Sequence, residues 1–186
     1  MTDETPYLET SRLLLRPLQL SDADSIQACF PRWDIVRFLN SRIPWPYPPD
    51  GALTFIRDIA LPAMRDGTLW NWSIRPKSEP DRLIGVITLR DGTEDNRGFW
   101  LDPAWQRHGL MTEAAAAVTE YWFEVLGRPM LRVLKAVANT RSRRVSEREG
   151  MRLVAIVERD FVSGRLPTEV WELTRDEWRM HPHPVT

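Results

Sequence analysis

The sequence predicts a mixed α/β (α+β) fold, in which a single, mostly antiparallel sheet carries helices on both faces. Three strand-like runs follow one another between residues 69 and 101, separated by turn-rich stretches, as in an antiparallel meander. After Pro103 the apolar period becomes that of a helix, and strands and helices then alternate along the chain. The length of 186 residues is close to that of one domain.

The N-terminal part begins with an apolar run that has arginine at both ends, which we interpret as one strand over residues 8–18. Ser21 follows with acidic residues just after it, so we place the cap of a helix there. Cys29 lies inside this helix as a small buried apolar residue. Four prolines within residues 44–49 remove backbone donors and fix φ, so this segment is a stiff aromatic loop, either a lid over a cleft or a rigid connector.

Further along, apolar spacing predicts a helix from about residue 52 to 65 that ends near Gly67. The meander strands are expected at residues 69–74, 83–89 and 98–101. A long helix follows and ends near Gly127, because Pro129 prevents its continuation. The last predicted elements are a strand at 131–137, a helix at 140–149, strands at 153–161 and 169–173, and a short helix at 175–179. We expect residues 1–180 to form one domain and residues 181–186 to be a frayed tail.

Composition and charge exclude several classes of function. The 25 lysines and arginines balance 26 aspartates and glutamates, for a net charge of −1, so nucleic acid is a poor partner. Only Lys77 and Lys135 are lysines, and we interpret the excess of arginine as residue usage along the whole chain. No apolar run has the length of a membrane span and no secretory leader is visible. With Cys29 as the single cysteine, we expect no internal disulfide and a cytoplasmic protein.

Residues 99–114 carry the strongest chemical signal. A strand leads through a tight loop into the first turn of the longest helix, whose N–H groups and dipole attract an anion. Gly109 lets the backbone approach a phosphate closely, and Arg107 and His108 add donors around it. A plain strand-loop-helix connection with a glycine at the bend is the alternative, and the loop alone leaves it open.

The same loop resembles the GNAT acetyltransferase pattern Gln/Arg-x-x-Gly-x-Gly/Ala. Gln106 and Gly109 match its first and fourth positions, while Met111 stands at the sixth. Met-Thr-Glu-Ala at residues 111–114 is similar to the RimJ/RimL branch, which acetylates protein N-termini and, in relatives, small-molecule amines. Residues 8–17, 83–87 and 139–145 add further similarity, and the resemblance covers roughly residues 8–178.

This resemblance implies acetyl-coenzyme A as the donor. In the family the pyrophosphate lies on the loop amides, which here belong to Arg107, His108, Gly109, Leu110, Met111 and Thr112. The pantetheine arm pairs with backbone near the end of the preceding strand, here around Leu101. Asn139 occupies the position that hydrogen-bonds this arm, although the same side chain would serve as a helix cap. Arg143 and Arg144 are candidates for the phosphates, and a merely exposed helical face would look the same.

The implied reaction is direct attack of a neutral amine on the thioester. Ser142 is the candidate catalytic residue at the thiol end. Many relatives carry a tyrosine four positions later, where this chain has Ser146, but a thiol pKa of about 8.5 makes the thiolate a tolerable leaving group. Relatives often place a glutamate base where Asn96 stands, and Asn96 takes no proton. We therefore choose Glu94 as the base, with Asp95 close by and a solvated hairpin tip as the alternative.

The sequence says less about the molecule that accepts the acetyl group. An α-amine, with a pKa of about 7.7 to 8.0, needs less help from a base than a lysine-like amine, so an α-amine or another low-pKa amine is favoured. We expect residues 44–49, Trp70 and Trp72 to shape the acceptor pocket. The competing function is a catalytically inert acyl-coenzyme A binding module. No metal is expected because no histidines and cysteines have zinc spacing, and the apolar strands leave a homodimer possible.

Overall fold

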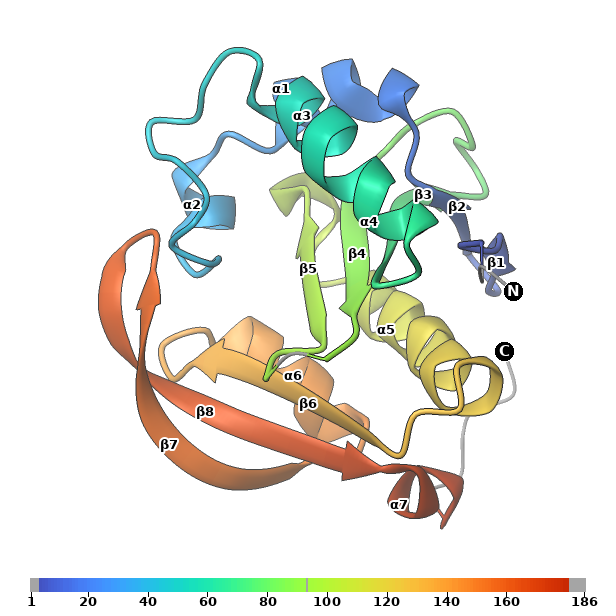
Figure 1. The fold of residues 1–186 in the computed structure, drawn as a ribbon, viewed down its shortest axis with the longest axis vertical. Helices are drawn as coiled ribbons and strands as arrows, with labels where there is room; N and C mark the ends of the chain where they lie inside the picture. Colours follow the sequence, from blue (N-terminus) through green and yellow to red (C-terminus); the bar gives the residue numbers. More distant parts are fainter. Residues whose placement is uncertain (1–3, 93, 181–186) are drawn as a thin grey trace.

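The structure, a computed structural model, describes residues 4–92 and 94–180 of the chain. In this part, five strands form one sheet in the order β1 (Leu8–Glu9), β2 (Leu13–Pro17), β3 (Leu69–Pro76), β4 (Gly85–Arg90) and β5 (Arg97–Leu101). A second sheet has the order β6 (Met130–Ala136), β8 (Gly164–Thr174), β7 (Arg152–Phe161). Every pair within the two sheets is antiparallel. The predicted fold class is confirmed, with the expected single sheet divided in two (Figure 1).

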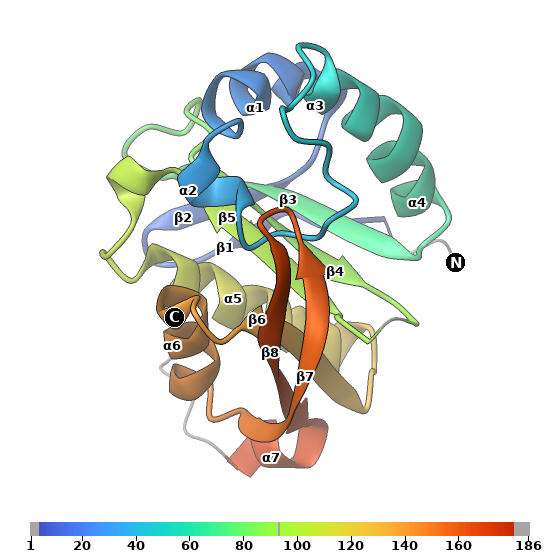
Figure 2. The ribbon, with the colours of Figure 1, turned by 90° about the vertical axis from the view of Figure 1, so that its left-hand side faces the viewer.

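Helices cover both faces of the five-stranded sheet, as predicted (Figure 2). One face carries α1 (Ala23–Cys29), α2 (Trp33–Val36) and a continuous helix made of α3 (Gly51–Thr54), a π-helical stretch (Phe55–Ala60) and α4 (Leu61–Arg65). The other face carries α5 (Leu110–Glu120), which continues as a π-helical stretch (Tyr121–Val125). The remaining helices are α6 (Thr140–Arg148), α7 (Arg175–Met180) and two 3₁₀ turns (Leu20–Asp22 and Pro103–Trp105).

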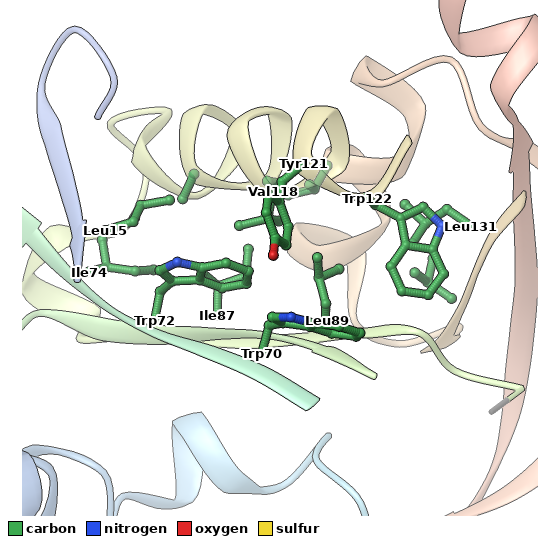
Figure 3. Close-up of a cluster of buried hydrophobic side chains, with 14 of the residues drawn as sticks. Leu15, Trp70, Trp72, Ile74, Ile87, Leu89, Val118, Tyr121, Trp122 and Leu131 are labelled. Atoms are coloured by element: carbon green, nitrogen blue, oxygen red, sulfur yellow. The ribbon is translucent and has the colours of Figure 1, made fainter. Parts of the chain in front are cut away.

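The main core lies between the five-stranded sheet and α5, and it contains Trp70 and Trp72. Their exposed fractions are 1% and 0%, and both rings meet Tyr121 edge to face, with ring centroids 6.5 and 5.6 Å apart (Figure 3). The prediction that these two tryptophans shape an acceptor pocket is therefore wrong. Because β3 is a central strand with helices on both faces, its large side chains are needed as core, where each stabilises the fold by about 2 to 3 kcal/mol.

The N-terminal segment differs from the single strand predicted over residues 8–18. The chain turns back at Thr10, whose N–H donates to Leu13 O at 3.0 Å, and β1 then pairs with β2. The next helical turn begins before the predicted cap at Ser21, because an Asp22 carboxylate oxygen accepts a hydrogen bond from the Gln19 N–H at 2.9 Å. Cys29 is half-buried, and burial followed by the charge of Asp102 raises its thiol pKa to about 11.

The other elements begin and end close to their predicted positions, with one exception at the last strand. β8 starts at Gly164, five residues before the predicted start, and forms a long hairpin with β7. Its first residues are mostly exposed, so they lack the apolar alternation on which the prediction depended. The predicted frayed tail, with His181 and His183, lies outside the described residues. No helix in the described part combines the length and apolarity that crossing a membrane requires.

Candidate functional site

The two sheets face each other through their edge strands, β5 and β6. At the start of β5, the Asn96 N–H donates to Arg132 O at 2.8 Å and the Arg132 N–H donates to Asn96 Oδ1 at 2.9 Å. Asp95 Oδ1 also accepts a hydrogen bond from the Leu134 N–H at 3.2 Å. From there the strands run apart (Figure 1). Two diverging strand edges can accept an extended polar arm between them, because edge strands present N–H and C=O groups.

The loop predicted to bind pyrophosphate begins where β5 ends. Asp102 accepts a hydrogen bond from the Ala104 N–H at 3.0 Å and thereby caps a 3₁₀ turn. Gln106 Nε2 then donates to Leu101 O at 2.8 Å, which ties the loop to the end of the strand. The loop amides therefore follow directly from the strand edge that was predicted to hold the pantetheine arm.

Gly109 is the N-terminal cap of α5 and has φ +75°. A Cβ at this position would meet only the Arg12 Nη2 atom, at 3.6 Å, so the backbone conformation and not the available space requires glycine. Arg107 also has a positive φ of 70°, and both Arg107 and His108 are exposed beside the first turn of α5. The first-turn N–H groups of α5, from Leu110 to Thr112, are of the kind that bind anions. The structure thus brings the predicted loop residues together.

A clamp that the sequence interpretation missed holds this loop. The Glu113 carboxylate, in the first turn of α5, accepts hydrogen bonds from Thr10 Oγ1, from Ser11 Oγ at 3.1 Å, from the Arg12 N–H at 2.8 Å and from Arg12 Nε at 2.7 Å. Arg12 Nη1 also donates to His108 O at 2.9 Å. Partial burial raises the pKa of Glu113, but the hydrogen bonds from Thr10 and Arg12 outweigh burial and lower it overall.

This clamp explains two stretches that carried the family resemblance. Residues 10–12 belong to the N-terminal stretch, and Glu113 belongs to Met-Thr-Glu-Ala. The polar Thr-Ser-Arg run inside an apolar segment was the signal in the sequence, and it also accounts for the turn that separates β1 from β2. The contact joins residues about a hundred positions apart, so local periodicity does not reveal it.

The start of α6 lies against the same loop. Arg141 Nη1 donates to Gln106 Oε1, which connects the two helix N-termini. Asn139 Oδ1 accepts a hydrogen bond from the Ser142 N–H at 3.2 Å, so Asn139 is the cap of α6. The cap contact uses the side-chain oxygen, which leaves the amide nitrogen as the part that a ligand would contact. Arg144 is exposed on this helix.

Arg143, a candidate for the phosphates, forms ion pairs within the protein. It pairs with Glu147 at 2.9 Å and with the buried Glu169 at 3.2 Å. Ser142 Oγ accepts a hydrogen bond from Lys135 Nζ at 2.7 Å. Ser146 is fully buried, and its hydroxyl has no hydrogen-bond partner among the described residues.

The predicted base, Glu94, lies in the turn between β4 and β5. Its side chain is 66% exposed and forms an ion pair with Arg159 on β7. The neighbouring Asp95 is half-buried, and burial raises its pKa. Asn96 is 7% exposed and links the two sheets, which is the role that an amide with both donors and an acceptor can fill at this position.

Several aromatic side chains lie near α1, α2 and the loop of residues 44–49. Phe30 contacts Tyr47 at 5.0 Å and Trp100 at 5.2 Å, measured between ring centroids, so Phe30 lies between the loop of residues 44–49 and β5. Trp33 and Trp45 contact each other at 5.6 Å and are 45% and 41% exposed. Burial raises the pKa of Tyr47 to about 12.

The tip of the β7–β8 hairpin closes onto the segment after α2 (Figure 2). The Val162 N–H donates to Leu39 O at 3.0 Å and the Ser163 N–H donates to Arg37 O at 3.2 Å. The hairpin tip and the aromatic loop therefore both attach to the α1–α2 region, on the face of β5 that Trp100 occupies.

A separate pocket of about 480 Å³ lies at the other edge of the five-stranded sheet, against β1 and β2. Its wall includes the Asp22–Arg75 ion pair at 2.5 Å, and it shares no lining residue with the loop or with β5. Among the described residues, no three histidine, cysteine, aspartate or glutamate side chains are grouped so as to hold a metal ion.

Comparisons with known proteins agree with this geometry. The family described as Acetyltransferase (GNAT) domain matches residues 12–152. YoaA, an uncharacterised N-acetyltransferase of Bacillus subtilis (strain 168), is 25% identical over 177 residues, which cover 91% of this chain and 97% of YoaA.

Two solved structures show the same fold. The ribosomal-protein-S5-alanine acetyltransferase of Vibrio fischeri has a TM-score of 0.79 at 16% identity, and the match covers 93% of this chain and 98% of that chain. RimJ of Mycobacterium smegmatis, solved in complex with CoA-disulfide, has a TM-score of 0.75 at 17% identity and covers 89% of this chain and 83% of that chain.

Proposed function

We propose that this chain, which belongs to the GNAT acetyltransferase family, acetylates the α-amino group of a protein or peptide. N-acetyltransferase activity follows from the family and from the relative named for it. The observation that carries the proposal is the loop at the start of α5 beside the diverging edges of β5 and β6. Acetyl-coenzyme A, the donor that the family uses, supplies an acetyl group activated as a thioester.

The residues present fit this donor. The amides from Arg107 to Thr112 lie where an anion is favoured, and exposed Arg107, His108 and Arg144 add positive charge. The edge of β5 around Leu101 offers backbone groups to an amide-bearing arm, and Asn139 stands where that arm would pass. We propose that Ser142 lies at the thiol end and that Glu94 removes the proton of the amine.

An α-amine suits this site for two reasons. Glu94 is exposed and already paired with Arg159, and an α-amine needs little help from a base because about a tenth of it is neutral at pH 7. The half-exposed Trp33–Trp45 pair suits an apolar peptide end. The solved neighbour of Vibrio fischeri is named for the alanine of a ribosomal protein, which supports a protein acceptor.

The test combines binding with turnover. Calorimetry with coenzyme A should give a saturable heat, and acetyl-coenzyme A with a panel of N-terminal dipeptides, amino acids and spermine should release free thiol, fastest with a dipeptide. Binding without thiol release from any acceptor would favour the inert binding module. A preference for spermine would overturn the proposed acceptor class.

Variants separate the two ends of the site. Trp45→Ala should raise KM for the peptide while coenzyme A affinity stays unchanged. Glu94→Gln should lower kcat/KM by about tenfold to a hundredfold at neutral pH, with Asp91→Asn in the same turn as the control. If Asp95→Asn were inactive and Glu94→Gln normal, the base assignment would pass from Glu94 to Asp95.

We also propose a homodimer and a cytoplasmic location. The outer edge of β7 is unpaired in the three-stranded order and carries Leu153, Val154 and Ile156, which are 43%, 41% and 63% exposed. Such an edge pairs readily with a second copy. Sedimentation analysis should give twice the chain mass, and Ile156→Lys should return the monomer.

The cytoplasmic location is supported by the single half-buried cysteine, which suits a reducing compartment. Cell fractionation tests this location.

A further inference from the structure

Lys135 differs from the other lysine of the chain in its surroundings. Lys77 has a 38% exposed side chain and pairs with Glu9 at 3.3 Å. Lys135 lies on β6, is 4% exposed, and takes part in no ion pair found among the described residues. A lysine is rarely buried in this way, because removing an ammonium group from water is costly unless the group is paired or functional.

The Lys135 ammonium group lies where β5, β6 and α6 come together. Its Nζ atom donates to Ser142 Oγ on α6 at 2.7 Å and stands 4.8 Å from the centroid of the Phe99 ring on β5. Ser142 is itself fixed, because its N–H donates to Asn139 Oδ1. Lys135 therefore reaches from β6 to the Phe99 ring on β5 and contacts Ser142, the residue proposed for the thiol end.

The charged side chains around Lys135 form ion pairs or hydrogen bonds with other groups. Arg97 on β5 pairs with Glu149 on α6 at 2.5 Å. Glu169, the cross-strand neighbour of Lys135 on β8, accepts hydrogen bonds from Trp171 Nε1 at 3.0 Å and pairs with Arg143 at 3.2 Å. Asp95, before β5, accepts from the Leu134 N–H.

Burial, followed by the charge of Arg97, lowers the pKa of Lys135 to about 7, although Asp95, Glu149 and Glu169 act in the opposite direction. A group with a pKa near the working pH exchanges its proton most effectively as an acid or base. A thiol has a pKa of about 8.5, so proton transfer from such an ammonium group to a thiolate is downhill.

We propose that Lys135 and Ser142 form a proton relay that protonates the departing sulfur of coenzyme A, an inference that rests on the proposed function. As the amine nitrogen bonds to the acetyl carbon and the carbon–sulfur bond breaks, the electron pair of that bond goes to sulfur. Ser142 gives its hydroxyl proton to sulfur and takes a proton from Lys135 Nζ. Lys135 is left as a neutral amine, the base holds the proton of the acceptor amine, and both groups exchange protons with water after the products leave.

Ser146 does not fill this role in the structure. Its hydroxyl is fully buried and has no partner in the described part of the chain, whereas Ser142 is joined to a proton source. Phe99 adds to the arrangement, since its ring face stabilises the ammonium form next to the site.

The first test uses the unmodified protein. Because the chain has only two lysines, NMR with lysine labelled at Cε gives two signals, and Lys77→Arg assigns them. Saturation with coenzyme A should shift the Lys135 signal and move its titration midpoint by at least half a pH unit, while Lys77 stays unchanged. Coenzyme A that binds by calorimetry without changing the Lys135 titration would overturn the relay and leave the proposed function intact; absence of binding would overturn the proposed function itself.

The second test uses variants of both relay members. Lys135→Met and Ser142→Ala should each lower kcat by about tenfold to a hundredfold with KM for acetyl-coenzyme A within about twofold, and the double variant should lose no more than either single variant. In Lys135→Met, the thiol of bound coenzyme A, followed by thiolate absorbance, should ionise at a higher pH than in the wild type. Additive losses in the double variant, or an unchanged ionisation of the bound thiol, would contradict the relay.

Discussion

Replacing Glu113 by alanine tests whether the clamp between residues 10–12 and α5 holds the loop before α5, which is proposed to bind coenzyme A. Thr10 is 5% exposed, and its hydrogen bond to a carboxylate contributes about 1.5 to 3 kcal/mol. The Arg12 side chain is 50% exposed, so its ion pair adds no more than about 1 kcal/mol. We therefore expect a loss of about 3 kcal/mol in the free energy of unfolding, which corresponds to a fall in Tm of about 6 to 12 °C for a chain of this size.

Binding should change together with stability. Arg12 also holds the His108 carbonyl, so without Glu113 the loop loses its attachment to the N-terminal segment. A loss of about 1.4 kcal/mol would weaken coenzyme A binding about tenfold. Thermal unfolding by circular dichroism and calorimetry with coenzyme A measure both effects. Glu120→Ala, at the exposed end of the same helix, is the matched control.

The pH dependence gives an independent check on the same carboxylate. Because the folded-state pKa of Glu113 is lowered, its contribution is fully present above its unfolded value of about 4.3 and is lost as the pH falls through the folded pKa. The stability difference between the wild type and Glu113→Gln should therefore shrink in acid. Equal Tm and equal affinity for Glu113→Ala and Glu120→Ala would refute the clamp.

Three further predictions concern the loop and the buried charges. Gly109→Ala should cost about 1 to 2 kcal/mol of unfolding free energy and weaken coenzyme A binding, because φ +75° strains a residue with a Cβ; unchanged urea unfolding would contradict this. Glu149→Gln should cost about 3 to 5 kcal/mol, since Arg97 is then left buried and unpaired, and a loss below about 1 kcal/mol would refute the buried pair. Because the folded-state pKa of Lys135 is lowered to about 7, wild-type stability relative to Lys135→Met should rise between pH 7 and about 10, as urea titrations at several pH values would show.

Local pattern was enough for most elements of the fold. The meander from β3 to β5 and the helices that end near Gly67 and Gly127 follow from apolar period and from glycines that now show φ of 65° and 66°. The prediction of one strand over residues 8–18 was wrong because Thr10 and its neighbours donate hydrogen bonds to the Glu113 carboxylate in a helix distant in sequence. Trp70 and Trp72 were misplaced because aromatic residues in a central strand and in a pocket give the same local pattern.

The candidate site likewise contains residues that local sequence pattern predicts and residues that it does not. The loop around Gly109 could be predicted because a glycine, two cations and a helix start lie together in the sequence. Asn139 and Ser142 followed from the resemblance, and their mutual contact is a helix cap, which is also local. Lys135 gave no signal, since a single lysine in a strand pattern is ordinarily exposed; only the approach of β5 and α6 to β6 places it beside Ser142.

The contacts on either side of the diverging strands β5 and β6 differ in strength, which implies that the two strands separate more easily at one end. At the closed end, Asn96 is buried and its side chain and backbone both bond to Arg132, so parting the strands there would leave buried amide groups without partners. At the other end, exposed Arg141 on α6 contacts Gln106 in the loop after β5, and water can replace this contact at little cost. We therefore expect a ligand that enters between β5 and β6 to displace the Arg141–Gln106 contact, while the Asn96–Arg132 end keeps its geometry.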